Sequence, residues 1–239
     1  MSIKLTIKHI LLTAIFASPC ALLQAASLQV APVIVEVAAP GAAATVTLRN
    51  QADKPLEGQV RVFRWTQVDG EDKLVPTDDV VASPPMVSLK SNTNYLVRIV
   101  RAKKEPVEGE ETYRLLIDEL PSPTADRRTA VNIVLRYSIP VFFTASGAAT
   151  GKLKWELQRK NNKQFLVARN DGSRRVRLAD LKATDGKGVV ASFGSGLSGY
   201  VLGGSSKSWL IPASAKNFGN GGIASVSATT DSGPINGKP

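Results

Sequence analysis

The chain contains few side chains that can act as nucleophiles, acid–base groups or metal ligands. Its single cysteine, Cys20, and its single histidine, His9, both lie in the first 25 residues. Catalysis by Ser-His-Asp or Cys-His groups needs an imidazole, and zinc sites are built largely from cysteine and histidine. The adjacent carboxylates Asp118 and Glu119 fall in an expected strand, where neighbours point to opposite faces. We therefore expect no cofactor, no metal site and no enzyme, although an enzyme based on lysine or carboxylates alone stays open.

Four arginines lie inside apolar runs that we expect to be strands: Arg98, Arg101, Arg114 and Arg136. A charged side chain in a half-buried strand costs free energy unless it faces solvent or has a partner. Two guanidinium groups beside one cleft would bind a carboxylate in bidentate fashion. We predict that Arg114 and Arg136 form such a pair, with ordinary solvent-facing arginines as the alternative.

An acidic turn at Asp69, Glu71 and Asp72 is the other cluster of charged groups. Carboxylates in a turn are able to bind calcium. A solvated hairpin explains the same residues without a ligand, and it is the interpretation we prefer.

The elements that must position these residues are strands. Short runs of β-branched and aromatic residues alternate with turn residues, and almost no segment has an apolar period of 3.6. The sequence therefore predicts an all-β protein. Seven runs within residues 26–145 match an immunoglobulin-like β-sandwich. The runs are 28–37, 43–50, 56–67, 86–89, 94–102, 111–119 and 130–143.

A second, smaller sandwich is predicted at 152–239, after a small-residue linker at 146–151. The carboxyl end is rich in Ser, Gly, Ala, Asn and Thr, so we expect one last strand followed by a flexible tail. The expected strands are 154–157, 164–170, 176–182, 188–191, 200–202, 207–211 and 223–228.

Residues 1–25 have the pattern of a secretory signal peptide. Lys4 and Lys8 precede a short apolar run at 10–20, and a small-residue cleavage site ends at Ala25. We therefore expect an exported protein that resides in the periplasm or outside the cell. The formal net charge of +10 suits acidic partners. Nucleic acid is disfavoured, because the basic residues are scattered and an exported protein seldom meets it.

The strand at 129–143 carries the strongest pattern in the chain. Val131, Ile133 and Leu135 belong to a long apolar row that continues through Tyr137 and Ile139. The alternate positions include polar and basic residues. Such a row is either the wall of the protein's own core or, at a sheet edge, a strand that pairs with another chain. The rest of the sequence favours the second interpretation.

The order and spacing of several short motifs resemble one known family. The chain resembles the periplasmic chaperones of chaperone-usher pilus assembly, in the PapD-like superfamily. The residues of its motifs are most similar to those of the archaic, spore-coat-protein-U type branch. The motifs are SLQVAP at 27–32, QVRVFRW at 59–65, SPP at 83–85, VRI at 97–99, YRLLIDELP at 113–121 and YSIPVF at 137–142.

The resemblance implies two sandwiches in a boomerang, or L-shaped, arrangement. It also implies donor-strand complementation, in which the last strand of the first domain completes a pilus subunit that lacks one strand. Val131, Ile133 and Leu135 match the donor row. The implied partners are pilus or fimbrial subunits and an outer-membrane usher, and a homodimer that caps the free edge stays open.

The chain departs from the family at the anchor of the subunit's terminal carboxylate. Well-known members use an arginine and a lysine, at positions where this sequence has Pro32 and Ser138. Other cations must replace them, and we predict Arg114 and Arg136. A structural or adhesive pilus subunit is the alternative class, and a carbohydrate-active exported protein is the third. No membrane insertion is expected, because no later segment approaches the roughly 20 apolar residues of a span.

Overall fold

A computed structural model of the chain describes residues 28–121, 134–219 and 221–237. These ranges fold into strands and loops without a helix, and therefore contain no helix that is long and apolar enough to span a membrane. The strands form four sheets, which pair into two immunoglobulin-like β-sandwich domains. The predicted all-β fold class is confirmed.

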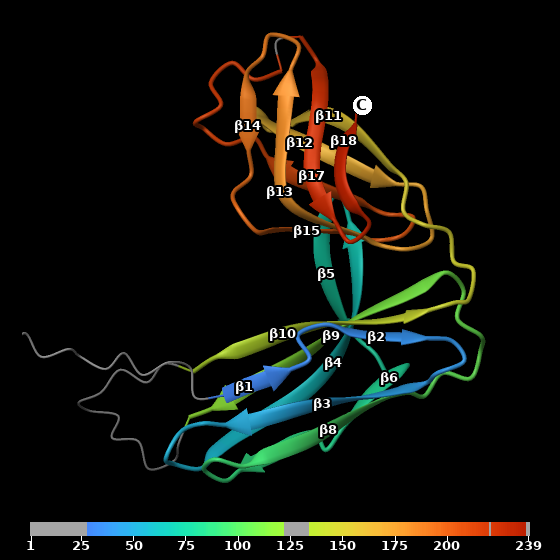
Figure 1. Ribbon diagram of the computed structural model, residues 1–239, viewed down its shortest axis with the longest axis vertical. Helices are drawn as coiled ribbons and strands as arrows, with labels where there is room; N and C mark the ends of the chain where they lie inside the picture. Colours follow the sequence, from blue (N-terminus) through green and yellow to red (C-terminus); the bar gives the residue numbers. More distant parts are fainter. Residues whose placement is uncertain (1–27, 122–133, 220, 238–239) are drawn as a thin grey trace, which may run out of the picture.

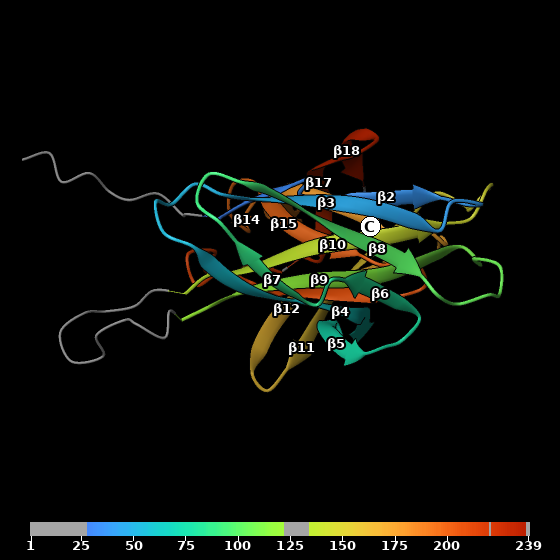
Figure 2. The same ribbon diagram turned by 90° about the horizontal axis from the view of Figure 1, so that it is seen from below.

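The first domain packs two sheets face to face. One sheet has the order β1-β3-β8-β6, and the other has the order β2-β10-β9-β4-β5, with β7 paired to the start of β4. The sheet that contains β9 and β10 lies between the other sheet and the second domain (Figure 1). In the view of Figure 2, β3 and β8 of the other sheet lie across β9 and β10. The bounds are β1 Leu28–Ala31, β2 Val35–Ala38, β3 Ala43–Asn50, β4 Leu56–Val68, β5 Glu71–Pro76, β6 Val80–Ser83, β7 Met86–Leu89, β8 Asn94–Arg101, β9 Glu110–Leu120 and β10 Arg136–Thr144.

The alternation of β9 and β10 divides their side chains between a core and an outer face. One register is buried in the sandwich core together with residues of the opposite sheet. The other register contains Arg114 and Arg136 and lies on the outer face, which is directed toward the second domain (Figure 1). The buried members are Tyr113, Leu115, Ile117, Ile139, Val141 and Phe143.

The second domain has a three-stranded sheet, β11-β12-β16, and a five-stranded sheet, β14-β13-β17-β18, in which β15 also pairs with β13. Trp155, Leu166, Leu178 and Val226 lie in the core between them. The bounds are β11 Leu153–Lys160, β12 Lys163–Asn170, β13 Val176–Asp185, β14 Val190–Ser192, β15 Leu197–Val201, β16 Ser206–Leu210, β17 Ile223–Thr230 and β18 Gly233–Gly237.

The first predicted strand, 28–37, is two strands in different sheets. β1 pairs antiparallel with β3, whereas β2 pairs in parallel with β10. Pro32 lies between them and has no N–H to donate to a ladder, so a continuous strand is interrupted there. The chain therefore contributes to both sheets, and β2 reaches the edge of β10.

Two further differences concern strands without a clear apolar alternation. β5 is exposed at all six positions, and β6 begins with adjacent valines of which only Val80 is buried, so neither strand was expected. The predicted flexible tail is wrong up to Gly237, since β18 pairs with β17. Its turn is held by Thr230, whose hydroxyl donates to the Gly233 carbonyl at 2.7 Å and accepts from the Ser232 N–H at 3.1 Å. A polar hairpin of this kind has no hydrophobic pattern that a sequence-based prediction detects.

The two domains lie in an L-shaped arrangement (Figure 1). The chain passes from β10 to β11 through residues 145–152, which include the predicted linker. A small aromatic cluster, which we call the junction cluster, packs between the domains. It consists of Trp65, Phe142, Tyr200 and Leu202.

Candidate functional site: an open sheet edge beside the domain junction

β10 is an edge strand along the first part of its length. On one side it pairs with β9 throughout, from Arg136 opposite Asp118 to Thr144 opposite Glu110. On the other side, β2 pairs only with residues 141–144. In the part of the chain that the structure describes, no strand pairs with residues 136–140 on that side. These unpaired backbone groups form an edge to which another chain can add a strand.

The apolar row that begins at Val131 extends into the protein's own core. Tyr137 and Ile139 continue the row, and Ile139 is buried in the core of the first domain. Leu135 lies just before β10, is half-buried, and its carbonyl accepts a hydrogen bond from the Glu119 N–H at 3.0 Å. Val131 and Ile133 lie outside the described residues, so their predicted role as a donor row stays a prediction.

Arg114 lies at the centre of the outer face, next to the junction cluster. Its guanidinium carbon stands 3.8 Å from the centre of the Trp65 ring and 5.9 Å from that of Tyr200. One guanidinium nitrogen donates to the Ser138 carbonyl at 3.4 Å. Burial lowers the pKa of Arg114, and Asp72 and Tyr200 only partly oppose this. Within the described ranges no carboxylate forms an ion pair with Arg114, and Asp72 acts on it only at longer range, so this half-buried cation has no directly bonded counter-charge.

Arg136 has different surroundings at the outer end of β10. It donates to Asp118, which also accepts from Arg61 at 2.5 Å. The Arg136 side chain is 61% exposed. The register places Arg114 opposite Pro140, four residues along β10 from Arg136, which is about 13 Å at the usual rise of a strand. The two arginines thus share a face, but their guanidinium groups contact different partners.

The Asp118 ion pairs give a prediction about acid stability. A hydrogen bond from Arg136 lowers the pKa of Asp118, burial opposes this, and a hydrogen bond from Arg61 adds to the lowering. A carboxyl whose folded pKa is depressed stabilises the fold above its unfolded pKa of about 3.9, and this contribution is lost as the pH falls through the folded value. We expect the urea midpoint of the wild-type protein to fall more steeply below about pH 4 than that of Asp118→Asn. Parallel curves for the two proteins would contradict this assignment.

A second set of contacts joins the domains next to the cluster. Arg175, of which only 6% of the side chain is exposed, forms ion pairs with Glu110 and Glu36 of the first domain. Its guanidinium carbon also lies 3.5 Å from the centre of the Phe142 ring. The Glu110 side chain is fully buried, and burial raises its pKa despite hydrogen bonds from Arg175 and Thr144. The junction is therefore closed by charges as well as by aromatic packing.

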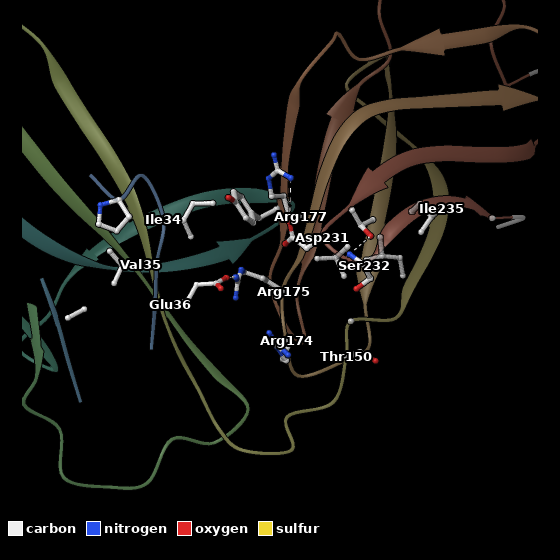
Figure 3. Close-up of a pocket in the computed structure, with 18 of the residues that line it drawn as sticks. Ile34, Val35, Glu36, Thr150, Arg174, Arg175, Arg177, Asp231, Ser232 and Ile235 are labelled. Carbon is white, nitrogen blue, oxygen red and sulfur yellow. Dashed lines mark hydrogen bonds and ion pairs between the residues drawn. The ribbon is translucent and has the colours of Figure 1, made fainter. Parts of the chain in front are cut away.

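A cleft of about 930 Å³ opens between the domains on the β2 side. Figure 3 shows Ile34 and Glu36 of the first domain facing Arg175, Arg177 and Asp231 of the second. Its walls mix apolar and charged side chains from both domains. The described ranges contain no cluster of three or more His, Cys, Asp or Glu side chains that could hold a metal ion.

The architecture has a match among protein families. The family model of pili and flagellar-assembly chaperones, PapD N-terminal domain, matches residues 27–148, which is just over half of the chain. The chain belongs to this family. The matched segment contains β1 to β10, and therefore the whole first domain with its open edge.

Solved structures of other pilus chaperones have the same fold. A chain of the CsuC–CsuE chaperone–tip adhesion subunit pre-assembly complex, from archaic chaperone-usher Csu pili of Acinetobacter baumannii, aligns with a TM-score of 0.70 and 24% identity, over 88% of this chain and 98% of that chain. The Pseudomonas aeruginosa CupB2 chaperone aligns with a TM-score of 0.56 and 20% identity, over 87% and 98%. A chain of the Salmonella enterica SafA pilin–SafB chaperone complex aligns with a TM-score of 0.62 and 20% identity, over 89% of this chain and 96% of that chain. A comparison with curated proteins found no match.

Several residues at the junction of this chaperone-family fold were missed by the prediction from sequence. Trp65 and Tyr200 look like ordinary core aromatics, and Arg175 looks like a surface residue next to a turn. Asp72 was interpreted as part of a solvated hairpin, but it lies at the junction and pairs with Lys207 of the second domain. No local pattern marks these residues, because each acquires its role from the other domain.

Proposed function

We propose that the protein is a periplasmic chaperone that binds secreted pilus subunits by donor-strand complementation and delivers them to an outer-membrane usher. The observation that carries this proposal is the open edge of β10 at residues 136–140, which continues directly from the proposed donor residues. The family assignment supports the same function. No catalytic role is proposed.

The binding step uses the backbone and the apolar row together. Residues 129–135 enter the groove of a subunit that lacks one strand, and main-chain hydrogen bonds supply general affinity. Val131, Ile133 and Leu135 fill the groove. Three buried aliphatic side chains contribute on the order of 5 to 9 kcal/mol before entropic costs. This suits a complex that is stable yet able to exchange.

Arg114 is our proposed anchor for the terminal carboxylate of the subunit. It is a half-buried cation without an ion pair in the described ranges, and it lies on the strand next to β10. A carboxylate placed there would gain a charge-assisted, bidentate hydrogen bond. Arg136, which was predicted as the second anchor, is proposed to act mainly through Asp118, at the point where the donor segment enters β10.

The partners follow from the same proposal. Two structural neighbours are chaperones in complex with a tip adhesion subunit and with a pilin. By analogy we propose pilus subunits as the ligands of this chain, with the usher as the acceptor. The archaic type, the periplasmic location and a homodimer that caps the free edge belong to this proposal as well.

Co-expression with a small exported β protein encoded next to this chain tests the function. We expect the two to co-purify from the periplasm as a 1:1 complex, and the chaperone alone to stay small on gel filtration. A chain that polymerises alone and captures no subunit would instead be a pilus subunit itself. That outcome would overturn the proposal.

A further inference from the structure

The β4–β5 hairpin of the first domain reaches the second domain (Figure 1). Gln67 near its tip contacts the other domain with both ends of its amide. Its nitrogen donates to the Tyr200 carbonyl at 2.8 Å, and its oxygen accepts from the Leu202 N–H at 3.0 Å. The Gly70 carbonyl accepts from the Ser208 N–H at 2.9 Å. The hairpin is thus docked on β15 and β16 through the backbone of the second domain.

Asp72 connects the docked hairpin to Trp65 of the junction cluster. One of its carboxylate oxygens accepts from the Trp65 indole N–H at 3.0 Å and from Gln67 at 2.8 Å. The other forms an ion pair with Lys207 at 2.6 Å, and only 16% of the Lys207 side chain is exposed. Burial alone would raise the pKa of Asp72, but hydrogen bonds from Lys207, Gln67 and Trp65 hold it below its usual value. The carboxylate is therefore ionised and held in one position.

Trp65 is the surface on which Arg114 rests. The Tyr200 ring stands edge-on to the indole of Trp65, with 5.5 Å between the two ring centres. The guanidinium carbon of Arg114 lies over the same indole, 3.8 Å from its ring centre. A continuous series of contacts thus runs from Lys207 through Asp72 and Trp65 to Arg114.

We propose that Lys207 is a positioning residue for subunit binding. By holding Asp72 and hence the indole of Trp65, the second domain keeps the Arg114 guanidinium in place for the subunit's terminal carboxylate. The role rests on the proposed anchor function of Arg114. The second domain then contributes to carboxylate recognition without touching the carboxylate.

A double-mutant cycle tests this role, with the subunit that co-purifies with the wild-type protein as the probe. The full chain carries Lys207→Met, Arg114→Ala, or both, and the dissociation constant is measured for each. We expect Lys207→Met to weaken binding about tenfold in the wild-type background and by less than about twofold in the Arg114→Ala background, because both changes act on one contact. Lys207→Arg, which keeps the positive charge beside Asp72, should bind the subunit with wild-type affinity. Lys216→Met, an exposed lysine of the same domain, is the matched control.

The outcomes separate the two proposals. Wild-type affinity in Lys207→Met, or an equal loss in both backgrounds, would overturn the positioning role and leave the anchor intact. Wild-type affinity in Arg114→Ala would overturn the anchor and the positioning role with it. If Lys207→Met does not fold, Lys207→Gln removes the same ion pair while it leaves the Asp72 carboxylate in place, and it should show the same dependence on Arg114.

Discussion

Replacing Val131 and Ile133 together with aspartate is expected to abolish subunit capture. In the proposed complex both side chains fill the hydrophobic groove of the subunit, where each is worth about 1.5 to 3 kcal/mol. Two buried, unpaired carboxylates would add a desolvation penalty to that loss. Binding should weaken by at least about 100-fold, which corresponds to roughly 3 kcal/mol. Co-purification from the periplasm, followed by a binding isotherm, measures the effect.

Val134→Asp is the matched control for this experiment. Val134 lies in the alternate register of the same segment and is 50% exposed. An aspartate there adds one negative charge to the same segment without entering the predicted row, so binding should change little. Undiminished capture by the double variant would remove the donor role. Equal losses in the control and the double variant would mean that charge, rather than register, determines binding.

Replacing Arg114 with alanine is expected to weaken subunit binding by about 30-fold or more. Truncating one partner of a buried, hydrogen-bonded charge pair commonly costs about 2 kcal/mol or more. The free protein should lose no more than about 2 kcal/mol of stability, because the stacking of the half-buried Arg114 on Trp65 contributes about 0.5 to 2 kcal/mol. Binding isotherms and urea unfolding of the same preparation separate the two effects.

Arg136→Ala is the comparison that separates the two arginines. Its side chain is largely exposed, and its partner Asp118 also accepts from Arg61. An exposed ion pair contributes little, so binding should fall by less than about fivefold. If both alanine variants bind like the wild type, other cations hold the carboxylate. If Arg136→Ala alone loses the subunit, Arg136 is the anchor and Arg114 is a structural residue.

The sequence by itself was sufficient for the fold class, the family and most of the strands. Alternation with period two is a local property, and a strand with one buried face must display it wherever it lies. β3 and β7 have the bounds that the sequence predicts. β5, β6 and β18 were missed, because none of the three shows a clear alternation of apolar and polar residues.

Only the tertiary structure distinguished the two predicted anchor residues. Arg114 and Arg136 are equivalent in the sequence, since both are arginines on strands of one face. The register of β9 with β10 places them at separate points of that face. Packing then sets Arg114 against the ring of Trp65 and Arg136 against the carboxylate of Asp118. Likewise Asp72 meets Lys207 across 135 positions of sequence. Electrostatic partners are selected by distance in space, which a local pattern does not encode, so the fold alone decided which charges meet.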